Sequence, residues 1–335
     1  MMREPWFWRD RSIAARVVAA GLTPGALVYD AARRWRESRT RPAPAPVPVF
    51  CVGNATVGGV GKTPFSLLLS SLIGECGVTA HFLTRGYGGA LAGPVRVDPS
   101  AHDAHAVGDE ALLLAVAAPT WVARARPAGA EAAAYAGAGA VIMDDGFQNH
   151  SLEKTLSFLL IDADDPYGNG KMLPAGPLRE PPAAAIARAA ALVYVVKSSA
   201  RGPAPVDSDR PSFRVWLEPD RRCDDERVIA FCGIGRPRRF FETVENAGGE
   251  IVGAVAFPDH HFYSEAEIAR LKETATRRSA RLITTEKDFV RLTPGARENI
   301  EPLGVKMVCD DADGIKTLLL EAIANFRRRR EDRNG

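Results

Sequence analysis

The residues most able to do chemistry lie in a glycine-rich segment that follows a short apolar run. Residues 54–63 read Asn-Ala-Thr-Val-Gly-Gly-Val-Gly-Lys-Thr, and a helical pattern begins at Lys62. The successive amides of such a loop, with the N-terminus of the helix, form a cradle for phosphate. Lys62 stands where an ammonium group reaches the β- and γ-phosphates, and Thr63 stands where a hydroxyl binds Mg²⁺. The segment predicts a nucleoside-triphosphate site, with a purely structural turn as the alternative.

This loop departs from the strict phosphate-loop pattern at one position. The pattern GxxxxGK[ST] has glycine where Thr56 stands, yet Gly-Gly-x-Gly-Lys-Thr between a strand and a helix is still specific. The residues expected to bind the nucleotide are Thr56, Val57, Gly58, Gly59, Val60, Gly61, Lys62 and Thr63.

Two acidic residues follow another apolar run, residues 140–143. A phosphate-binding loop needs a carboxylate at the end of a neighbouring strand to hold Mg²⁺. Asp144 and Asp145 occupy that place. The alternative is an exposed pair of carboxylates without a ligand. Gln148, shortly after them, could orient a hydroxyl group or a water molecule of the substrate site.

A second acidic pair, Asp109 and Glu110, opens a predicted helix. Carboxylates near a helix N-terminus are stabilised by the helix dipole, so simple capping is the alternative to function. In the functional interpretation one of the two acts as a base, and the other belongs to the metal site together with Thr63, Asp144 and Asp145.

Two loops that contain arginine complete the candidate site. Residues 85–89, Arg-Gly-Tyr-Gly-Gly, follow a predicted strand and would lie at the sheet edge where α/β proteins bind ligands. Arg85 and Tyr87 are therefore candidate substrate contacts, and a plain turn is the alternative. Arg179 lies in a proline-rich loop, and its guanidinium suits a phosphate. A surface ion pair is the other interpretation of Arg179.

Further along the chain, residues 257–261 read Phe-Pro-Asp-His-His. A lone histidine is usually structural, but two adjacent histidines behind an aspartate in a loop indicate function, and His260 is the candidate. Residues 285–288, Thr-Glu-Lys-Asp, superficially suggest the guanine-reading pattern T-K-x-D. Because Lys287 and Asp288 are adjacent, the spacing is wrong, and no GTP specificity is inferred.

The elements that must position these residues alternate between short apolar runs and helical patterns. This alternation predicts an α/β fold like that of the P-loop NTPases, a mostly parallel sheet with helices on both faces. The expected strands are 49–53, 81–84, 121–123, 140–143, 157–161 and 192–196, and the expected helices are 62–75, 109–117, 128–136 and 183–191.

A polar, proline-containing stretch, residues 199–209, suggests a domain boundary. Beyond it we expect a second, smaller α/β unit. Its expected strands are 213–217, 228–232, 251–256, 282–284 and 305–309, and its expected helices are 238–246, 264–275 and one from residue 313. The predicted domains are an N-terminal segment, 1–41, a P-loop kinase domain, 42–205, and a C-terminal α/β domain, 206–335, that closes over the nucleotide.

The N-terminal segment differs in charge from the rest of the chain. Residues 1–41 carry nine arginines and four acidic residues, whereas the whole chain has a net charge of only +2. Three aromatic residues at 6–8 lie among arginines, and Arg16 interrupts the apolar stretch 13–29, which leaves too few uncharged residues to span a bilayer. The pattern predicts an amphipathic helix on an anionic membrane surface. A helix docked on its own domain and a signal peptide are the alternatives.

Length and composition exclude several classes of protein. A chain of 335 residues fits roughly two domains and buries a core that needs no disulfides. The small net charge argues against general nucleic-acid binding, and neither a nucleic acid nor an obligate protein partner is expected. Five scattered cysteines without a CxxC pair indicate neither a structural zinc site nor a disulfide framework, which suggests a reducing compartment.

Seven motifs, taken in order, resemble those of one family, the tetraacyldisaccharide 4′-kinases, which are the lipid A 4′-kinases of Gram-negative bacteria. The motifs begin at residues 53, 85, 108, 144, 173, 257 and 285. The resemblance covers the chain from about Trp6 to Asp288. The family commonly has serine or threonine where Thr56 stands, so the departure noted above agrees with the resemblance.

The resemblance implies that ATP phosphorylates the 4′-hydroxyl of an acylated glucosamine disaccharide 1-phosphate to give the 1,4′-bisphosphate. It implies a monotopic enzyme on the cytoplasmic face of the inner membrane, in contact with anionic lipids. It also implies that Asp109 is the base, assisted by His260, and that Mg²⁺ is held by Thr63 with Asp144, Asp145 or Glu110.

Two other functions remain open at this point. A membrane-associated P-loop ATPase switch of the partitioning type has a similar loop, although its signature lysine is replaced here by Val57. A non-catalytic nucleotide-binding scaffold would leave Asp109 and His260 without a role.

Overall fold

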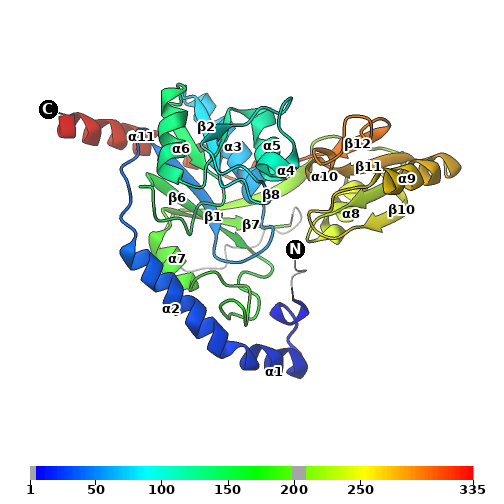
Figure 1. Ribbon diagram of the computed structural model, residues 1–335, viewed down its shortest axis with the longest axis horizontal. Helices are drawn as coiled ribbons and strands as arrows, with labels where there is room; N and C mark the ends of the chain where they lie inside the picture. The colour runs from blue at the N-terminus through cyan, green and yellow to red at the C-terminus, as the bar shows by residue number, and fades with distance from the viewer. Residues whose placement is uncertain (1–4, 198–208, 335) are drawn as a thin grey trace.

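The computed structural model describes residues 5–197 and 209–334 of the chain. A large sheet with helices on both faces forms the main unit, and a smaller α/β unit lies beside it (Figure 1). Two helices near the N-terminus run along the lower side of the main unit in this view, and the C-terminal helix extends from it on the left.

The main sheet has nine strands. They are β1 (Val49–Asn54), β2 (Ala80–Thr84), β3 (Val95–Arg96), β4 (Thr120–Val122), β5 (Ala140–Met143), β6 (Leu156–Asp162), β7 (Ala191–Val195), β8 (Ser212–Pro219) and β13 (Val305–Cys309). Their order is β13-β8-β7-β6-β1-β5-β2-β4-β3. All neighbouring pairs are parallel except the two edge pairs, β13 with β8 and β3 with β4.

Helices cover both faces of this sheet. They are α3 (Lys62–Glu75), α4 (Ala104–Val107), α5 (Asp109–Ala117), α6 (Arg126–Tyr135), α7 (Pro182–Arg188) and α11 (Ala312–Asn334). Every residue of β1 and β5 is buried, as expected for strands covered on both faces. Alternate β1 residues enter two core clusters, Phe50 with α3, α5 and α11 on one face, and Cys51 with α6 and α7 on the other. The predicted fold class is confirmed.

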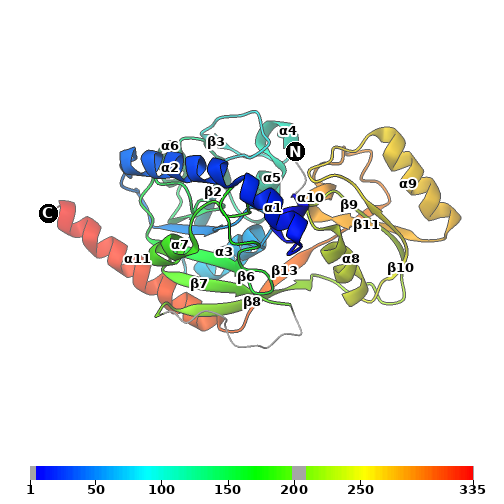
Figure 2. The same cartoon turned by 90° about the horizontal axis from the view of Figure 1, so that it is seen from below.

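The smaller unit contains a four-stranded parallel sheet. Its elements are β9 (Arg227–Cys232), α8 (Pro237–Asn246), β10 (Glu250–Ala256), α9 (Glu265–Arg277), β11 (Arg281–Thr285), α10 (Glu286–Phe289) and β12 (Ile300–Leu303). The strand order is β10-β9-β11-β12. Helices α8 and α9 lie on opposite faces of this sheet, each over its own core cluster (Figure 2).

The predicted composition of the C-terminal domain was wrong at both ends. Strands β8 and β13 and helix α11 belong to the main unit, because β8 pairs in parallel with β7 and β13 pairs antiparallel with β8. Residues Pro219 and Val305 are partners in that pairing, so the chain leaves and re-enters the main sheet at adjacent points. The alternation of strand and helix does not say which sheet a strand joins. The boundary predicted at 199–209 falls almost entirely outside the described residues.

The N-terminal segment forms a short 3₁₀ turn, η1 (Trp6–Trp8), and two consecutive helices, α1 (Ile13–Gly21) and α2 (Thr23–Arg39). One helix had been expected, but Pro24 starts a new helix at its first turn. Trp8 is buried, and its indole NH donates to the carbonyl of Pro174 at 3.1 Å. Among the described residues, no helix combines the length and the apolar character needed to cross a membrane.

Candidate active site

The glycine-rich loop lies between β1 and α3, at the carboxyl edge of the main sheet. Val57 donates its amide to Pro177 O at 2.8 Å, which fixes the start of the loop. Gly58 and Gly61 have φ of 115° and 93°, conformations that favour glycine. The amides of residues 58–61 make no backbone hydrogen bond within the described chain, so they are available to an anion.

Lys62 is held at the start of α3 by two oxygen-bearing side chains. Its ammonium donates to Asn54 Oδ1 at 3.1 Å and lies 3.6 Å from Asp145 Oδ1. Asn54 in turn donates to Thr56 Oγ1 at 3.1 Å, so the first residue of the predicted nucleotide-binding set also has a fixed side chain. This arrangement positions one cation at the mouth of the phosphate-binding loop.

The two aspartates after β5 have different surroundings. Asp144 is buried and accepts hydrogen bonds from Ser66 Oγ at 2.8 Å and from Thr63 Oγ1 at 3.4 Å. Burial and the nearby charge of Glu110 raise the pKa of Asp144 well above its usual value. A buried carboxylate beside a second acid and a threonine hydroxyl is suited to a divalent cation, which would relieve that electrostatic cost.

Asp145 is instead paired with cations of the protein. Arg179 donates to both of its oxygens, at 3.0 and 3.2 Å, and Lys62 lies nearby. Although burial alone would raise it, these two cations lower the pKa of Asp145 to about 2. Asp145 therefore orients Lys62 and Arg179, and Asp144 is the better metal ligand of the pair.

Among the described residues, no group of three or more His, Cys, Asp or Glu side chains is arranged to hold a metal ion. P-loop proteins bind Mg²⁺ through one or two side chains together with phosphate oxygens and water. Thr63 and Asp144 fit that requirement. The charge of Glu110 helps to raise the pKa of Asp144, but the Glu110 carboxylate accepts a hydrogen bond from Lys287 Nζ at 2.9 Å.

Gln148 is engaged within the protein. Its amide nitrogen donates to Asn54 O and to Glu180 Oε1, both at 2.8 Å, and its oxygen accepts from Arg179 at 3.3 Å. Gln148 and Arg179 are predicted to contact the substrate, but in this structure both side chains are hydrogen-bonded within the protein. In this arrangement both residues support the end of β1 and Asp145.

The Arg-Gly-Tyr-Gly-Gly turn packs against the start of α5. Gly108 has φ of 85°, and a Cβ there would lie 2.4 Å from Tyr87 O, so only glycine fits this close approach. Arg85 and Tyr87 are exposed, and the Tyr87 ring lies 6.2 Å from the His260 ring. The turn thus places Tyr87 beside the start of α5 and His260.

Asp109, the first residue of α5 in the main unit, contacts residues of the small unit. Its Oδ2 lies 2.9 Å from His260 Nδ1 and accepts from Arg291 Nε at 3.0 Å, with a second contact to Arg291 Nη2. Its other oxygen accepts from the amide of Glu110. Although burial alone would raise it, His260, Lys287 and Arg291 hold the pKa of Asp109 well below its usual range. The N-cap of α5 is Gly108 and no side chain caps the helix, so capping does not explain these contacts.

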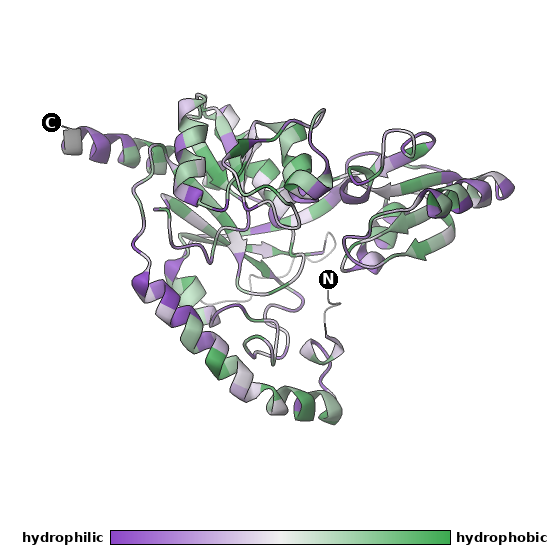
Figure 3. Ribbon diagram, viewed as in Figure 1, coloured by the Kyte–Doolittle hydropathy of each residue, from purple (hydrophilic) through white to green (hydrophobic). Residues whose placement is uncertain are grey.

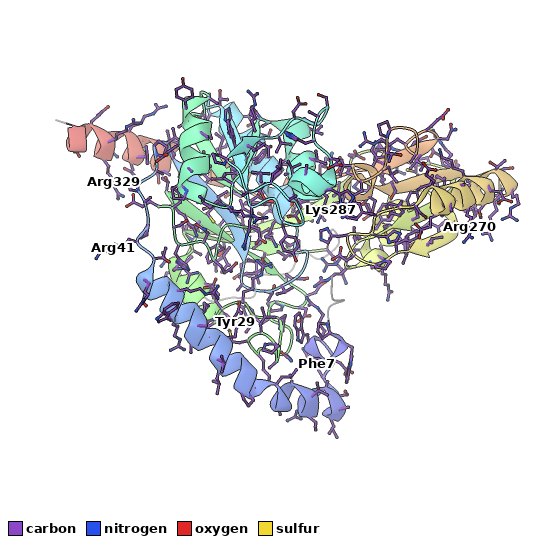
Figure 4. The ribbon with its side chains drawn as sticks, in the orientation of Figure 1. Phe7, Tyr29, Arg41, Arg270, Lys287 and Arg329 are labelled. Atoms are coloured by element: carbon purple, nitrogen blue, oxygen red, sulfur yellow. The ribbon has the colours of Figure 1, made fainter. Side chains whose placement is uncertain are left out.

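Further contacts across the boundary hold the small unit in place. Asp162, at the end of β6, accepts from Arg236 at 2.8 Å and from Arg239 at 2.9 Å. The Phe262 ring stacks on His105 with centroids 3.9 Å apart. Lys287, which pairs with Glu110, also lies at this boundary (Figure 4). The two units are therefore in direct contact on several sides of the Asp109–His260 pair.

Sequence reasoning missed three cationic residues here. Lys287 and Arg291 are four positions apart in a helical turn, a spacing that places them on one face. Arg126, after β4 at the carboxyl edge of the sheet, is buried, and its Nε has no hydrogen-bond partner. Burial, followed by the charge of Arg85, lowers the pKa of Arg126 to about 10. Arg126 is thus a buried cation near Asp144 and Asp145, with Arg85 close to it.

The adjacent histidine, His261, has a different role. Its Nε2 lies 3.1 Å from Glu267 Oε1, and Glu267 forms the capping box of α9 with Ser264. Of the two histidines, His260 is the one that contacts Asp109 of the main unit, and its catalytic role stays a prediction. His260 has φ of 57°, and its amide donates to Gly233 O, so the loop backbone aims this side chain.

These features together define a P-loop kinase: a phosphate cradle with its lysine, a buried carboxylate behind it, and a carboxylate–histidine pair that a second unit brings to the same sheet edge. A sequence model of the tetraacyldisaccharide-1-P 4′-kinase family matches residues 18–324. The chain belongs to this family.

Individual relatives agree with that assignment. The chain is 48% identical to a tetraacyldisaccharide 4′-kinase of Rhodospirillum centenum over 95% of its own length and 96% of that protein. It is 49% identical to one of a Methylobacterium species, covering 93% of this chain and 95% of the relative. Its fold is similar to that of LpxK from Aquifex aeolicus, crystallised in complex with ATP, with a TM-score of 0.76, 27% identity and coverage of 91% and 99%.

Proposed function

We propose that this protein transfers the γ-phosphate of ATP to the 4′-hydroxyl of a tetraacyldisaccharide 1-phosphate, a step of lipid A biosynthesis. The observation that carries this proposal is the approach of His260 to Asp109 at the edge of the sheet that also holds Lys62 and Asp144. Family membership supports the choice of acceptor.

Phosphoryl transfer depends mainly on positioning and on neutralising charge. The amides of residues 58–61 would hold the phosphate chain, and Lys62 would neutralise the oxygens of the group in transfer. Thr63 and Asp144 are the residues that would hold Mg²⁺, which supplies further charge neutralisation when bound. Arg85 and Arg126 would attract the negatively charged acceptor to the same edge.

The acceptor hydroxyl must lose its proton as the new P–O bond forms and the bond to the β-phosphate oxygen breaks. The geometry supports a division of labour in which Asp109 orients His260 through Nδ1 and His260 accepts the proton at Nε2. Asp109 itself is almost fully surrounded by donors, and its lowered pKa makes it a weak base. The resemblance had implied the reverse assignment, with Asp109 as the base.

The N-terminal helices support a position at a membrane surface, which we place at the cytoplasmic face of the inner membrane. Large apolar side chains on α1 and α2 are exposed; they are Ile13, Val17, Val18, Leu27, Val28 and Trp35. Helix α1 is mostly hydrophobic, whereas the end of α2 is mostly hydrophilic (Figure 3). Exposed apolar groups beside arginines are typical of helices that lie in the interface of an anionic bilayer.

The test is incubation with ATP, Mg²⁺ and the disaccharide 1-phosphate in neutral detergent micelles, followed by mass spectrometry of the lipid. The expected result is one added phosphate, located at the 4′ position by fragmentation. Lys62→Ala should abolish this product while the protein keeps its melting temperature. ATP hydrolysis without any phosphorylated lipid would instead favour the switch of the partitioning type.

A further inference from the structure

Helix α11 continues beyond its last contact with the hydrophobic core. Four apolar residues of its first half are buried in the core of the main unit; they are Ile315, Leu319, Ala322 and Ile323. Between residues 324 and 332 no side chain is buried, and the helix extends from the main unit in Figure 1. The protruding part is therefore not held by core packing, and it presents its side chains to the surroundings.

This protruding part carries four consecutive arginines, Arg327 to Arg330, and all four are exposed. Within the described chain, none of them forms an ion pair. Arg328 donates to the side chain of Asn325 at 2.6 Å, and Arg330 donates to Pro46 O at 2.7 Å. Two acidic residues follow at 331 and 332, so four arginines and two acids leave segment 327–332 with a net charge of +2.

The end of α2 adds three more exposed arginines, Arg36, Arg39 and Arg41. In the part of the chain that the structure describes, these three also lack an ion pair. The Arg39 guanidinium lies 4.7 Å from the centre of the Trp35 ring, and Trp35 is 58% exposed. Tryptophan is enriched at the level of the lipid headgroups, where its ring and a neighbouring cation both find partners.

The two groups of arginines lie at the same end of the molecule. Pro46, which accepts from Arg330, belongs to the connector between α2 and β1. The ends of α2 and α11 lie on the left in both Figure 1 and Figure 2, and Figure 4 shows Arg41 and Arg329 on that side. We call these seven residues the basic surface; they are Arg36, Arg39, Arg41 and Arg327 to Arg330.

We propose that the basic surface binds the anionic headgroups of a phospholipid bilayer and gives the protein a second membrane contact, in which the C-terminal helix takes part. The inference rests on the membrane position proposed for α1 and α2. A bilayer is favoured over a nucleic acid or an acidic protein because the basic surface continues along α2, whose exposed apolar side chains need an apolar partner. The whole chain has a net charge of only +2, so the attraction must come from this concentration of arginines.

A second contact has a consequence for the orientation of the protein. Stable attachment of a peripheral protein usually combines an apolar group with a polybasic patch. Here the apolar helix α1 lies at one end of α2, and the basic surface lies at the other end (Figure 1). Contacts at both ends would limit how far the main unit can tilt on the bilayer.

The experiment measures sedimentation of the full chain with two kinds of vesicle, phosphatidylcholine alone and equal parts of phosphatidylcholine and phosphatidylglycerol. Arg327→Gln together with Arg329→Gln removes two charges and keeps good helix-forming residues. Each arginine near an anionic surface strengthens binding about fivefold, so this pair should weaken binding to the anionic vesicles by at least tenfold. Binding to phosphatidylcholine alone should not change, and added salt should reduce the difference between the pair and the wild type.

The matched control is Arg270→Gln together with Arg277→Gln on α9. Both residues are exposed, and their removal changes the net charge equally. Arg270 lies at the opposite end of the molecule from Arg329 (Figure 4), so this pair should bind anionic vesicles like the wild type. Both pairs should keep the wild-type melting temperature. They should also keep wild-type kinase activity in neutral detergent micelles, which present no anionic surface.

Three results would overturn the inference. The first is wild-type binding of Arg327→Gln/Arg329→Gln to the anionic vesicles, and the second is an equal loss in both pairs, which would trace the effect to overall charge. The third is unchanged vesicle binding with weakened binding of RNA, which would assign the basic surface to a nucleic acid. A wild type that binds vesicles as expected but phosphorylates no disaccharide would refute the proposed kinase reaction and leave this inference standing.

Discussion

His260 Nδ1 lies 2.9 Å from Asp109 Oδ2, although the two residues are 151 positions apart and belong to different units. The contact leaves Nε2 of the same ring turned away from Asp109, with Asp259 at 3.9 Å as its nearest charged neighbour. A histidine held through one nitrogen by a carboxylate has a defined orientation for proton transfer at the other. The pair exists only while the small unit rests against the main one.

The first prediction concerns this pair. Asp109→Asn and His260→Ala should each lower kcat by at least a hundredfold while the KM for ATP stays similar, because the pair acts on the acceptor hydroxyl and not on the nucleotide. The double variant should lose less than the product of the two single losses, as expected for residues that act as a unit. Steady-state kinetics and melting temperatures provide the measurement. A stable and fully active Asp109→Asn would show that the Asp109 carboxylate is not needed for the reaction.

The second prediction concerns Arg291. Its guanidinium is buried and bonds to Asp109, to Asp288 at 2.8 Å and to Gly233 O at 3.0 Å. Arg291→Met leaves two carboxylates buried without their cation, which should cost about 3–5 kcal/mol of unfolding free energy. Arg291→Lys keeps a charge but cannot make these contacts together, so it should fold and yet lose most of kcat. Denaturant unfolding and kcat measure the two effects, and wild-type kcat in Arg291→Lys would contradict the positioning role.

The third prediction separates the two aspartates after β5. Asp144→Asn should raise the Mg²⁺ concentration needed for half-maximal rate by at least tenfold, because Asp144 is the carboxylate next to Thr63. Asp145→Asn should leave the Mg²⁺ requirement nearly unchanged and weaken ATP binding, since Asp145 orients Lys62. Rates measured against Mg²⁺ at saturating ATP distinguish the two outcomes. The reverse pattern would exchange the roles.

The fourth prediction concerns the membrane surface. Val17→Ser together with Leu27→Ser removes two exposed apolar side chains from α1 and α2. Each contributes about 1.5–3 kcal/mol when fully buried, so binding to vesicles of anionic phospholipid should weaken by at least tenfold. Val116→Ser, an equally exposed change on α5, is the control and should bind like the wild type. Vesicle sedimentation measures both, and equal binding by all three proteins would make the N-terminal helices an internal packing element.

The fifth prediction concerns acid pH. Asp109 and Asp162 both join the two units, and their pKa values in the folded protein lie below the usual 3.8 because, despite burial, the histidine and cations of the small unit favour their charged forms. A lowered pKa contributes stability that is fully present above the ordinary value and is lost as the pH falls through the folded value. The units should therefore separate as the pH drops below about 4, before the main sheet unfolds. Small-angle scattering should show an increased radius of gyration there, and Asp162→Asn should reduce the pH dependence of stability.

Much of the main unit could be predicted from the sequence because its strands are short, continuous apolar runs separated by helical patterns. The predicted helices at 62–75 and 109–117 coincide with α3 and α5. The short elements β3 and α10 were missed, because two to four residues cannot show a period, whereas β4 and β5 are equally short but could be predicted as apolar runs. The placement of β8 and β13 in the main sheet depends on pairing between distant segments, which has no local signal.

The candidate site likewise contains residues that could be predicted from the sequence and residues that could not. Motif spacing predicts Lys62, Asp144 and Asp109 as site residues, since each follows from the geometry of a strand end or a helix start. Neither Arg291 nor Arg126 belongs to a recognisable motif, and their importance comes from burial among groups that the fold brings together. Likewise, nothing in the sequence separates Asp144 from Asp145, because the difference lies in the cations near each one.

The return of the chain to the main sheet on β13 has a consequence for synthesis on the ribosome. Translation proceeds from the N-terminus, so α1, α2 and the phosphate-binding loop emerge early, while β13 and α11 emerge last. Met307 of β13 packs against the loop so closely that a Cβ on Gly61 would lie 3.0 Å from its methyl group. Until residue 307 has left the exit tunnel, one edge of β8 has no neighbour and the loop lacks part of its support. The main sheet therefore becomes complete only after the whole small unit has been made, and a chain cut short within that unit would lack β13 and the contact of Met307 with the loop.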